Sequence, residues 1–254
     1  MSELKDMKQL LYTDAYYPPE IARYLNPKKP TILRFDPELG YIHLNHCMHD
    51  GLDNTKSAGT YVPHGMYRKT INYADQPCRI NTYGDSYTQC AQVSDGETWQ
   101  ETLASHFREP IRNFGVGGYG VYQAYRRAMR TEAIKDLAAE YIVLNIWDDD
   151  YMRNIDAARW IRVGWMCRGL PRGKTDGYPV HGFPWMHVRY DLVKGKWEER
   201  PGMCKKVTDL RKLVGKDNFY NAFKDDTVAH LYCLREGGVA PVDELEVLAE
   251  EFGV

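Results

Sequence analysis

Between residues 78 and 147, three short apolar segments alternate with two segments of helical periodicity. The apolar segments are CRINTYG, IRNFGV and YIVLNIW, and the helical segments are TWQETLASHF and VYQAYRRAMRTEAIKDLAAE. Periodicity of this kind predicts strands and amphipathic helices, with Asp95 or Thr98 at the start of the first helix. Apolar strands separated by helices are typical of a parallel sheet that is covered on both faces. The sequence therefore predicts an α/β core.

The chain on either side of this core has a different pattern. From residue 31 to residue 72, short β-prone pieces alternate with Gly, Asp, Asn and Pro, which predicts a small antiparallel accessory layer. After residue 156, VRYDLVKGKWEER predicts a hairpin that turns near Lys194 and Gly195. We therefore expect an N-terminal arm and β-rich accessory region over residues 1–75, and an α/β domain over residues 76–254.

Only three strands have the pattern of central strands, whereas a doubly wound sheet typically has about five or six. We therefore expect the core to be incomplete at the C-terminus.

Composition argues against two classes of partner. The formal net charge of −2 argues against binding of nucleic acid, because phosphate binding needs a clustered basic surface. The longest apolar stretch, around residues 141–147, is far too short to span a bilayer, and the N-terminus has no apolar run of signal-peptide length. The cysteines are scattered without a CxxC pair, which fits reduced thiols. We expect a soluble, cytoplasmic protein whose oligomeric state is open.

A polar or glycine-rich loop follows each apolar segment. Tyr83-Gly84-Asp85-Ser86 follows the first, residues 113–120 with four glycines follow the second, and residues 145–154 with three consecutive aspartates follow the third. Each loop alone has an ordinary interpretation as a turn, a tight connection or a helix cap. Together they predict a site, because ligands bind at the carboxyl edge of open α/β sheets. Against a dinucleotide site, the glycine-rich loop is not the first βα turn, where the GxGxxG motif belongs, and no acidic residue closes a following short strand at the expected distance.

The segments INTYGDSYTQC, NFGVGGYG and LNIWDDDYMRN resemble, in order and spacing, the first three sequence blocks of the SGNH (GDSL-like) hydrolases. The resemblance covers about residues 81–154, under a third of the chain. It implies a flavodoxin-like three-layer core with a parallel sheet. It also implies that Ser86 is the nucleophile, and we expect Asp85, which precedes it, to be a catalytic residue as well. The oxyanion hole would be formed by the N–H groups of Ser86 and Gly118, with its remaining donor from the third block at Asp149.

Two departures from the family pattern concern this third donor and the general base. Where the family has asparagine, the chain has Asp149, and an ionised carboxylate accepts hydrogen bonds where the hole needs a donor. Either Asp149 is protonated, or it and its neighbours play another role. The DxxH motif of the family is absent, and the nearest spacing, Asp226 to His230, is one residue too long and lies within a helical pattern.

Three explanations of the missing base compete. His230 serves as the base despite its spacing, the sequence is the N-terminal portion of a longer enzyme, or the chain is inactive. We favour the second explanation, because one assumption then accounts for both the missing strands and the missing histidine.

The expected activity is hydrolysis of an oxygen-linked acyl group through an acyl-serine intermediate, without a cofactor. The resemblance favours a small-molecule ester or an acylated carbohydrate, with an O-acetyl sugar preferred. Substrate-binding candidates in the three loops are Tyr87, Tyr119, Trp147 and Asp148. Two alternatives stay open: an acyltransferase of the same fold, and a non-catalytic SGNH-like binding module that lacks the catalytic histidine.

A histidine cluster at residues 43–50 also contains ligand types that bind transition metals. Along one regular strand, His43 and His49 would share a face and His46 would lie on the opposite face. We therefore predict no metal site and interpret the cluster as polar surface or hairpin residues. A metal-dependent hydrolase that uses these histidines or Asp148 to Asp150 is the competing hypothesis.

Overall fold

The computed structural model describes residues 32–49, 56–62, 66–159, 183–214, 216–226 and 228–229. Contacts group these residues into two compact units. The sheet unit comprises residues 32–34 and the described residues of 41–154, and the hairpin unit comprises residues 35–40 and the described residues from 155 onward. The predicted domain boundary at residue 75 stays a prediction. In the described part of the chain, no helix has the length and apolar character needed to cross a membrane.

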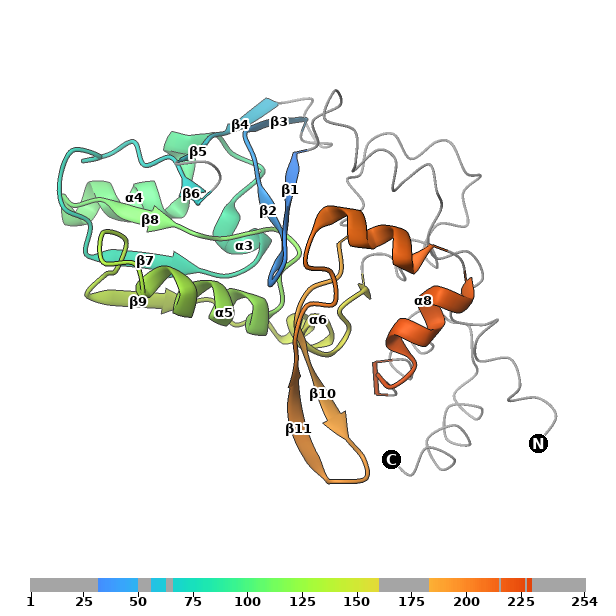
Figure 1. Ribbon diagram of the computed structural model, residues 1–254. Coiled ribbons are helices and arrows are strands. Elements are labelled where there is room, and N and C mark those ends of the chain that lie inside the picture. The colour runs from blue at the N-terminus through green and yellow to red at the C-terminus, as the bar shows by residue number, and fades with distance from the viewer. Residues whose placement is uncertain are drawn as a thin grey trace. The chain divides into compact units, whose positions relative to one another are not determined.

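The sheet unit is built on a five-stranded sheet with the strand order β5-β6-β8-β7-β9. β7 lies between β8 and β9 and pairs in parallel with both, whereas β6 pairs antiparallel with β8, and β5 antiparallel with β6 (Figure 1). The strands are β5 (Tyr61–Val62), β6 (Tyr67–Arg68), β7 (Ile80–Tyr83), β8 (Ile111–Asn113) and β9 (Tyr141–Leu144).

The predicted flavodoxin-like core with a parallel sheet is wrong, because this sheet is mixed. Its three predicted strands form and run parallel, but β5 and β6 from the expected accessory region extend it in the antiparallel sense. Strands of two residues have no measurable periodicity, so the sequence pattern could not assign them to this sheet. β9, expected to be buried, lies at the sheet edge with Tyr141, Ile142 and Val143 about half exposed.

Helices α4 (Trp99–Phe107) and α5 (Val121–Glu132) lie on opposite faces of β7. The Thr82 hydroxyl accepts a hydrogen bond from Gln100 of α4, whereas the neighbouring Asn81 and Tyr83 side chains both donate to Glu132 of α5. Successive residues of a strand point to opposite faces, so the two helices must cover different sides.

The ends of these helices are set by side chains. Thr98 is the N-cap of α4, one of the two predicted starts, and its hydroxyl accepts the N–H of Glu101. α5 ends eight residues before its predicted end at residue 140. The Glu132 carboxylate accepts the N–H of Ala139, so the chain after α5 turns back onto this side chain instead of continuing the helix.

The core of the sheet unit forms around an aromatic pair. The rings of Tyr83 on β7 and Phe114, just after β8, stack with centroids 4.9 Å apart. Ala128 of α5 completes the buried cluster, with Tyr67 and Leu144 packed against it. This packing fixes the carboxyl ends of β7 and β8 against each other.

Two hairpins precede the sheet. β1 (Leu33–Asp36) pairs with β2 (Gly40–His43), and β3 (His46–His49) pairs antiparallel with β4 (Lys56–Gly59). They lie in the region that the sequence predicts to be antiparallel.

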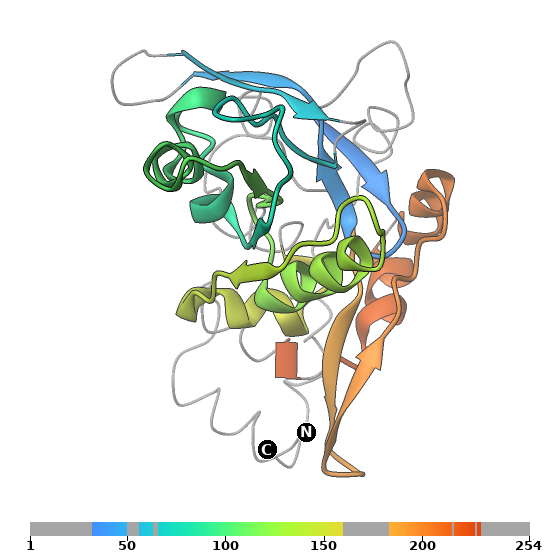
Figure 2. The ribbon, with the colours of Figure 1, turned by 90° about the vertical axis from the view of Figure 1, so that its left-hand side faces the viewer.

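The hairpin unit contains an antiparallel ribbon formed by β10 (His187–Asp191) and β11 (Lys196–Arg200) (Figure 2). The turn includes Gly195 at φ +62, which confirms the predicted turn near Lys194 and Gly195. The 3-10 helix η4 (Val207–Leu213) and helix α8 (Lys216–Phe223) follow. Fully buried side chains of this unit include Trp185, Leu210, Phe219 and Phe223.

Candidate functional site

Ser86 lies on a tight turn at the carboxyl end of the central strand β7. It is half-buried and is the first residue of the short helix α3 (Ser86–Gln89). Asp85 is the N-cap, and its Oδ1 accepts the N–H of Tyr87 at 2.9 Å. A Cβ on Gly84 would lie 2.2 Å from Oγ1 of Thr88, so the turn requires glycine. The sequence thus places a hydroxyl at the ligand-binding edge of the sheet.

The glycine-rich loop after β8 packs directly on this turn. The N–H of Val116 donates to the carbonyl oxygen of Gly84 at 3.0 Å, and the N–H of Gly117 donates to Oε1 of Gln89 at 2.7 Å. A Cβ on Gly115 would lie 2.3 Å from the backbone nitrogen of Gln89. Glycine therefore permits the close approach of the two loops.

The loop after β9 completes the arrangement through Asn145 and Arg153. The backbone N–H of Asn145 donates to the Tyr83 carbonyl oxygen at 2.8 Å, and its side chain donates to Oδ1 of Asp85 at 3.1 Å. Arg153, on α6 (Tyr151–Ile155), has its Nη1 4.0 Å from Oδ2 of Asp85. The first and third loops are therefore joined at one buried carboxylate.

Arg153 links the second and third loops as well. Its Nη1 donates to the Tyr119 carbonyl oxygen at 3.0 Å and forms an ion pair with Asp150. A Cβ on Gly120 would lie 2.7 Å from the Cβ of Arg153, so the glycine-rich loop and α6 are in close contact. This contact holds the guanidinium beside the Ser86 turn.

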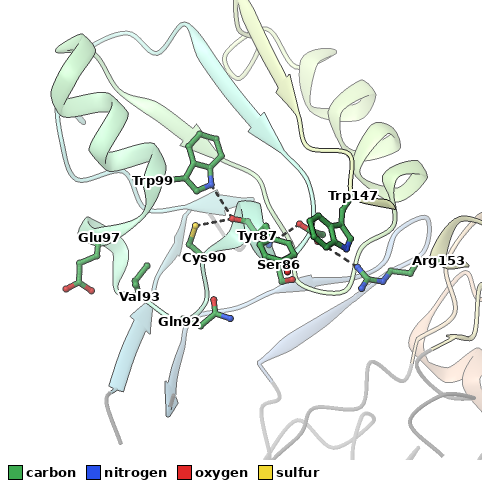
Figure 3. Close-up of a pocket in the computed structure, with 10 residues that line it drawn as sticks. Ser86, Tyr87, Cys90, Gln92, Val93, Glu97, Trp99, Trp147 and Arg153 are labelled. Carbon is green, nitrogen blue, oxygen red and sulfur yellow. Dashed lines mark hydrogen bonds and ion pairs between the residues drawn. The ribbon is translucent and has the colours of Figure 1, made fainter. Parts of the chain in front are cut away.

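A pocket of about 600 Å³ opens beside Ser86, within the size range of small-molecule sites. Its wall carries an aromatic pair, Tyr87 and Trp147, whose ring centroids are 4.9 Å apart. Trp99 Nε1 and the Cys90 thiol both donate to the backbone oxygen of Tyr87 at 3.2 Å, as Figure 3 shows. Polar groups are contributed by Asp85, Gln92, Glu97 and Arg153.

Cys90 is the other nucleophile type in this pocket. Burial raises the pKa of its thiol. The thiol therefore stays protonated at neutral pH, as its donation to Tyr87 also indicates, and it is a poor nucleophile in this state. Ser86 is thus the better candidate.

The predicted site residues divide into those at the pocket and those away from it. Ser86, Asp85, Tyr87 and Trp147 line it. Gly118, with φ +84, and the exposed Asp148 are not among its described lining residues. Tyr119 is fully buried, and its hydroxyl donates to the Tyr41 carbonyl oxygen, so its side chain belongs to the core.

Two predicted residues cannot be placed in this way. The backbone of Asp149 lies in the 3-10 turn η3 (Asp148–Asp150), but its side chain lies outside the described part of the structure. His230 lies outside the described residues altogether.

Sequence reasoning missed Asn145, Arg153 and Trp99. Asn145 directly follows β9, which is the position that a search for polar residues after strands selects. Arg153 lies three residues after Asp150, a spacing at which helical side chains interact. Trp99 reaches the pocket only through tertiary packing, so no local pattern indicates it.

The residues of the histidine cluster do not lie along one regular strand. The chain leaves β2 at His43 and starts β3 at His46, so the two rings lie with centroids 5.5 Å apart. His43 is buried and stacks on Tyr61. Among the described residues, no group of three or more His, Cys, Asp or Glu side chains is arranged to hold a metal ion.

Comparison of the chain with protein-family models, with curated proteins and with solved structures returns no match in any of the three.

Proposed function

We propose that the protein is a serine ester hydrolase in which Ser86 forms an acyl-enzyme intermediate. The observation that supports this most directly is the position of Ser86. It is a half-buried serine on a glycine-dependent turn at the carboxyl end of the central strand, and it lines a pocket of small-molecule size. The proposed reaction requires no cofactor.

In the proposed reaction, Oγ of Ser86 attacks the acyl carbon of the ester while a base takes its proton. The ester C–O bond then breaks, the alcohol leaves with that proton, and water hydrolyses the acyl-serine to release the acid. The backbone N–H groups of Ser86 and Gly118 are the proposed donors to the resulting oxyanion. Asp85 acts as a positioning residue, because its carboxylate is already engaged by the N–H of Tyr87 and the side chain of Asn145.

The wall of the pocket favours an acylated carbohydrate or a similar small ester. Tyr87 and Trp147 are about half exposed and offer flat apolar surfaces with polar edges. Gln92, Glu97 and Arg153 lie around them and can hydrogen-bond hydroxyl groups. An acyltransferase would use the same intermediate, with an alcohol in place of water.

A non-catalytic binding module is the second candidate, and one observation favours it. None of the described residues that line the pocket is a histidine. Without a base, the same aromatic wall would bind a ligand but leave Ser86 unreactive.

We also propose a cytoplasmic location. The described cysteines Cys47, Cys78, Cys90 and Cys204 are all free thiols, which fits a reducing compartment.

Labelling with a fluorophosphonate probe tests the nucleophile. The intact chain should be labelled, and Ser86→Ala should abolish the label because the probe needs an activated hydroxyl. Ser105→Ala, at an exposed serine of α4, is the matched control and should be labelled like the unmodified protein. A folded protein that stays unlabelled, or equal labelling of Ser86→Ala, would reject the hydrolase and leave the binding module.

A further inference from the structure

A second pocket, of about 370 Å³, lies within the hairpin unit and has no part in the proposed hydrolase site. β10, β11, the segment after β11 and the end of α8 all contribute to it. Its lining residues include His187, Arg200, Met203, Lys205, Asp225 and Asp226.

A buried histidine–aspartate pair forms one wall. Nε2 of His187 lies 2.9 Å from Oδ2 of Asp226, and both residues are about 5% exposed. An ionised carboxylate only accepts hydrogen bonds, so the nitrogen that faces it, Nε2, carries a hydrogen. In the neutral form of the ring, Nδ1 then holds a lone pair. Asp226 therefore fixes one tautomer of His187.

The other ring nitrogen of His187 is left without a partner. Nδ1 is buried, and no described residue forms a hydrogen bond with it. A buried acceptor without a donor is unfavourable, so such groups call for a specific explanation. A ligand hydroxyl in the adjoining pocket would supply the missing donor.

Two cations of the pocket also have no partner among the residues that the structure describes. Arg200 is the cross-strand neighbour of His187, so their side chains share a face of the ribbon. Within the described chain, neither Arg200 nor the exposed Lys205 forms an ion pair. The two carboxylates of the pocket interact with groups other than these cations. Asp226 pairs with His187, and Oδ2 of Asp225 lies 3.9 Å from Nη1 of Arg189. The two cations are therefore available to an anion.

We propose that this pocket binds a small hydroxylated molecule that carries an oxyanion. Arg200 and Lys205 hold the phosphate or carboxylate, since Arg pairs with such groups in a bidentate manner and Lys acts as a point charge. Nδ1 of His187 accepts a hydrogen bond from the ligand hydroxyl. The volume suits a small metabolite.

Isothermal titration of the full chain with three probes tests this site. The probes are sn-glycerol 3-phosphate, propyl phosphate, which lacks the hydroxyls, and glycerate, which replaces phosphate by carboxylate. We expect saturable binding of glycerol phosphate or glycerate, and the tighter of the two identifies the oxyanion. Glycerol phosphate should bind more tightly than propyl phosphate because only it can donate to His187.

Variants separate the two halves of the site. Arg200→Gln and Lys205→Gln should each weaken binding about tenfold, the usual scale for loss of one charge-assisted contact. Lys206→Gln, at the exposed neighbour of Lys205 that does not line the pocket, should bind like the unmodified protein. Asp226→Asn should abolish the advantage of glycerol phosphate over propyl phosphate, because an amide can donate to Nε2 and shift the hydrogen to Nδ1.

Failure of all three probes to saturate would overturn the proposal, as would equal binding by Arg200→Gln, Lys205→Gln and Lys206→Gln. Equal affinity for glycerol phosphate and propyl phosphate in the unmodified chain would reject the contact with His187. This last comparison needs no substitution at a buried position, so it holds even if Asp226→Asn does not fold.

Discussion

Asp85 shows how one residue can organise a site without reacting. Its carboxylate caps α3 by accepting the N–H of Tyr87 and also accepts a hydrogen bond from the side-chain amide of Asn145. Its Oδ2 lies 4.0 Å from Nη1 of Arg153. It is 2% exposed, so these contacts are sheltered from water. The position of Ser86 depends on this carboxylate.

Asp85→Ala should therefore lower the free energy of unfolding by about 2 kcal/mol, from loss of a helix cap and of a buried hydrogen bond. Urea denaturation measures this change. Asp148→Ala, at an exposed aspartate of the loop after β9, should change it by less than about 0.5 kcal/mol. Equal effects of the two substitutions would show that Asp85 does not hold the turn.

His46 couples stability to pH. Burial lowers the pKa of His46 below its ordinary value of 6.5. Between the lowered value and 6.5 the unfolded chain binds more protons than the folded chain, so acidification favours unfolding. The free energy of unfolding therefore receives its full contribution from neutral His46 above about pH 6.5. This contribution is lost as the pH falls from 6.5 through the lowered pKa of the folded chain.

We expect His46→Gln to lose less stability than the unmodified protein when the pH is lowered from about 7.5 to about 5.5, because the variant lacks this proton uptake. Urea midpoints at the two pH values provide the measurement. His106→Gln, at an exposed histidine of α4, should retain the full acid sensitivity. An unchanged acid response in His46→Gln would contradict the assignment.

At the scale of elements, the position of a strand in the sheet decides how far its side chains are buried and so how much they stabilise the fold. Ile111 of β8 is 2% exposed, whereas Ile142 of the edge strand β9 is 51% exposed. Both residues belong to segments that the sequence predicts to be central strands, and local pattern does not distinguish a central strand from an edge strand. Only the strand order places one inside and the other at the surface.

Ile111→Ala should destabilise the protein by about 3 kcal/mol, because it removes buried methyl groups and leaves a cavity. The same substitution at Ile142 should change the free energy of unfolding by less than about 1 kcal/mol, since its side chain is already half in water. Urea unfolding of the two variants is the test. Similar losses would mean that β9 is buried under further structure.

At the scale of the whole molecule, most contacts fall within the sheet unit or within the hairpin unit. Each unit has its own buried aromatic residues, such as Phe114 in the sheet unit and Phe219 in the hairpin unit. Local opening of a protein follows such cooperative groups of contacts.

Phe114→Ala should accelerate hydrogen exchange in β7, β8 and α5 and leave β10, β11 and α8 unchanged, because it opens only the core of its own unit. Phe219→Ala should give the reverse pattern. Peptide-resolved exchange followed by mass spectrometry distinguishes the two. If either substitution accelerates exchange throughout the chain, the two units unfold as one.

Local patterns in the sequence were sufficient for several features. They predict the three strands that become β7, β8 and β9, a helix start at Asp95 or Thr98, the turn at Gly195, and the loops at which Ser86 and the glycines lie. Each of these depends on residues close together in the chain, where alternation, capping and glycine conformations act directly.

Only the tertiary structure decided the mixed sheet, the exposed edge at β9 and the contacts of Asp85 with Arg153 and of His187 with Asp226. His187 and Asp226 lie 39 residues apart. Periodicity reports whether a segment has a buried face, but not which distant segment covers it. That choice is set by packing across the whole chain, which no local pattern encodes.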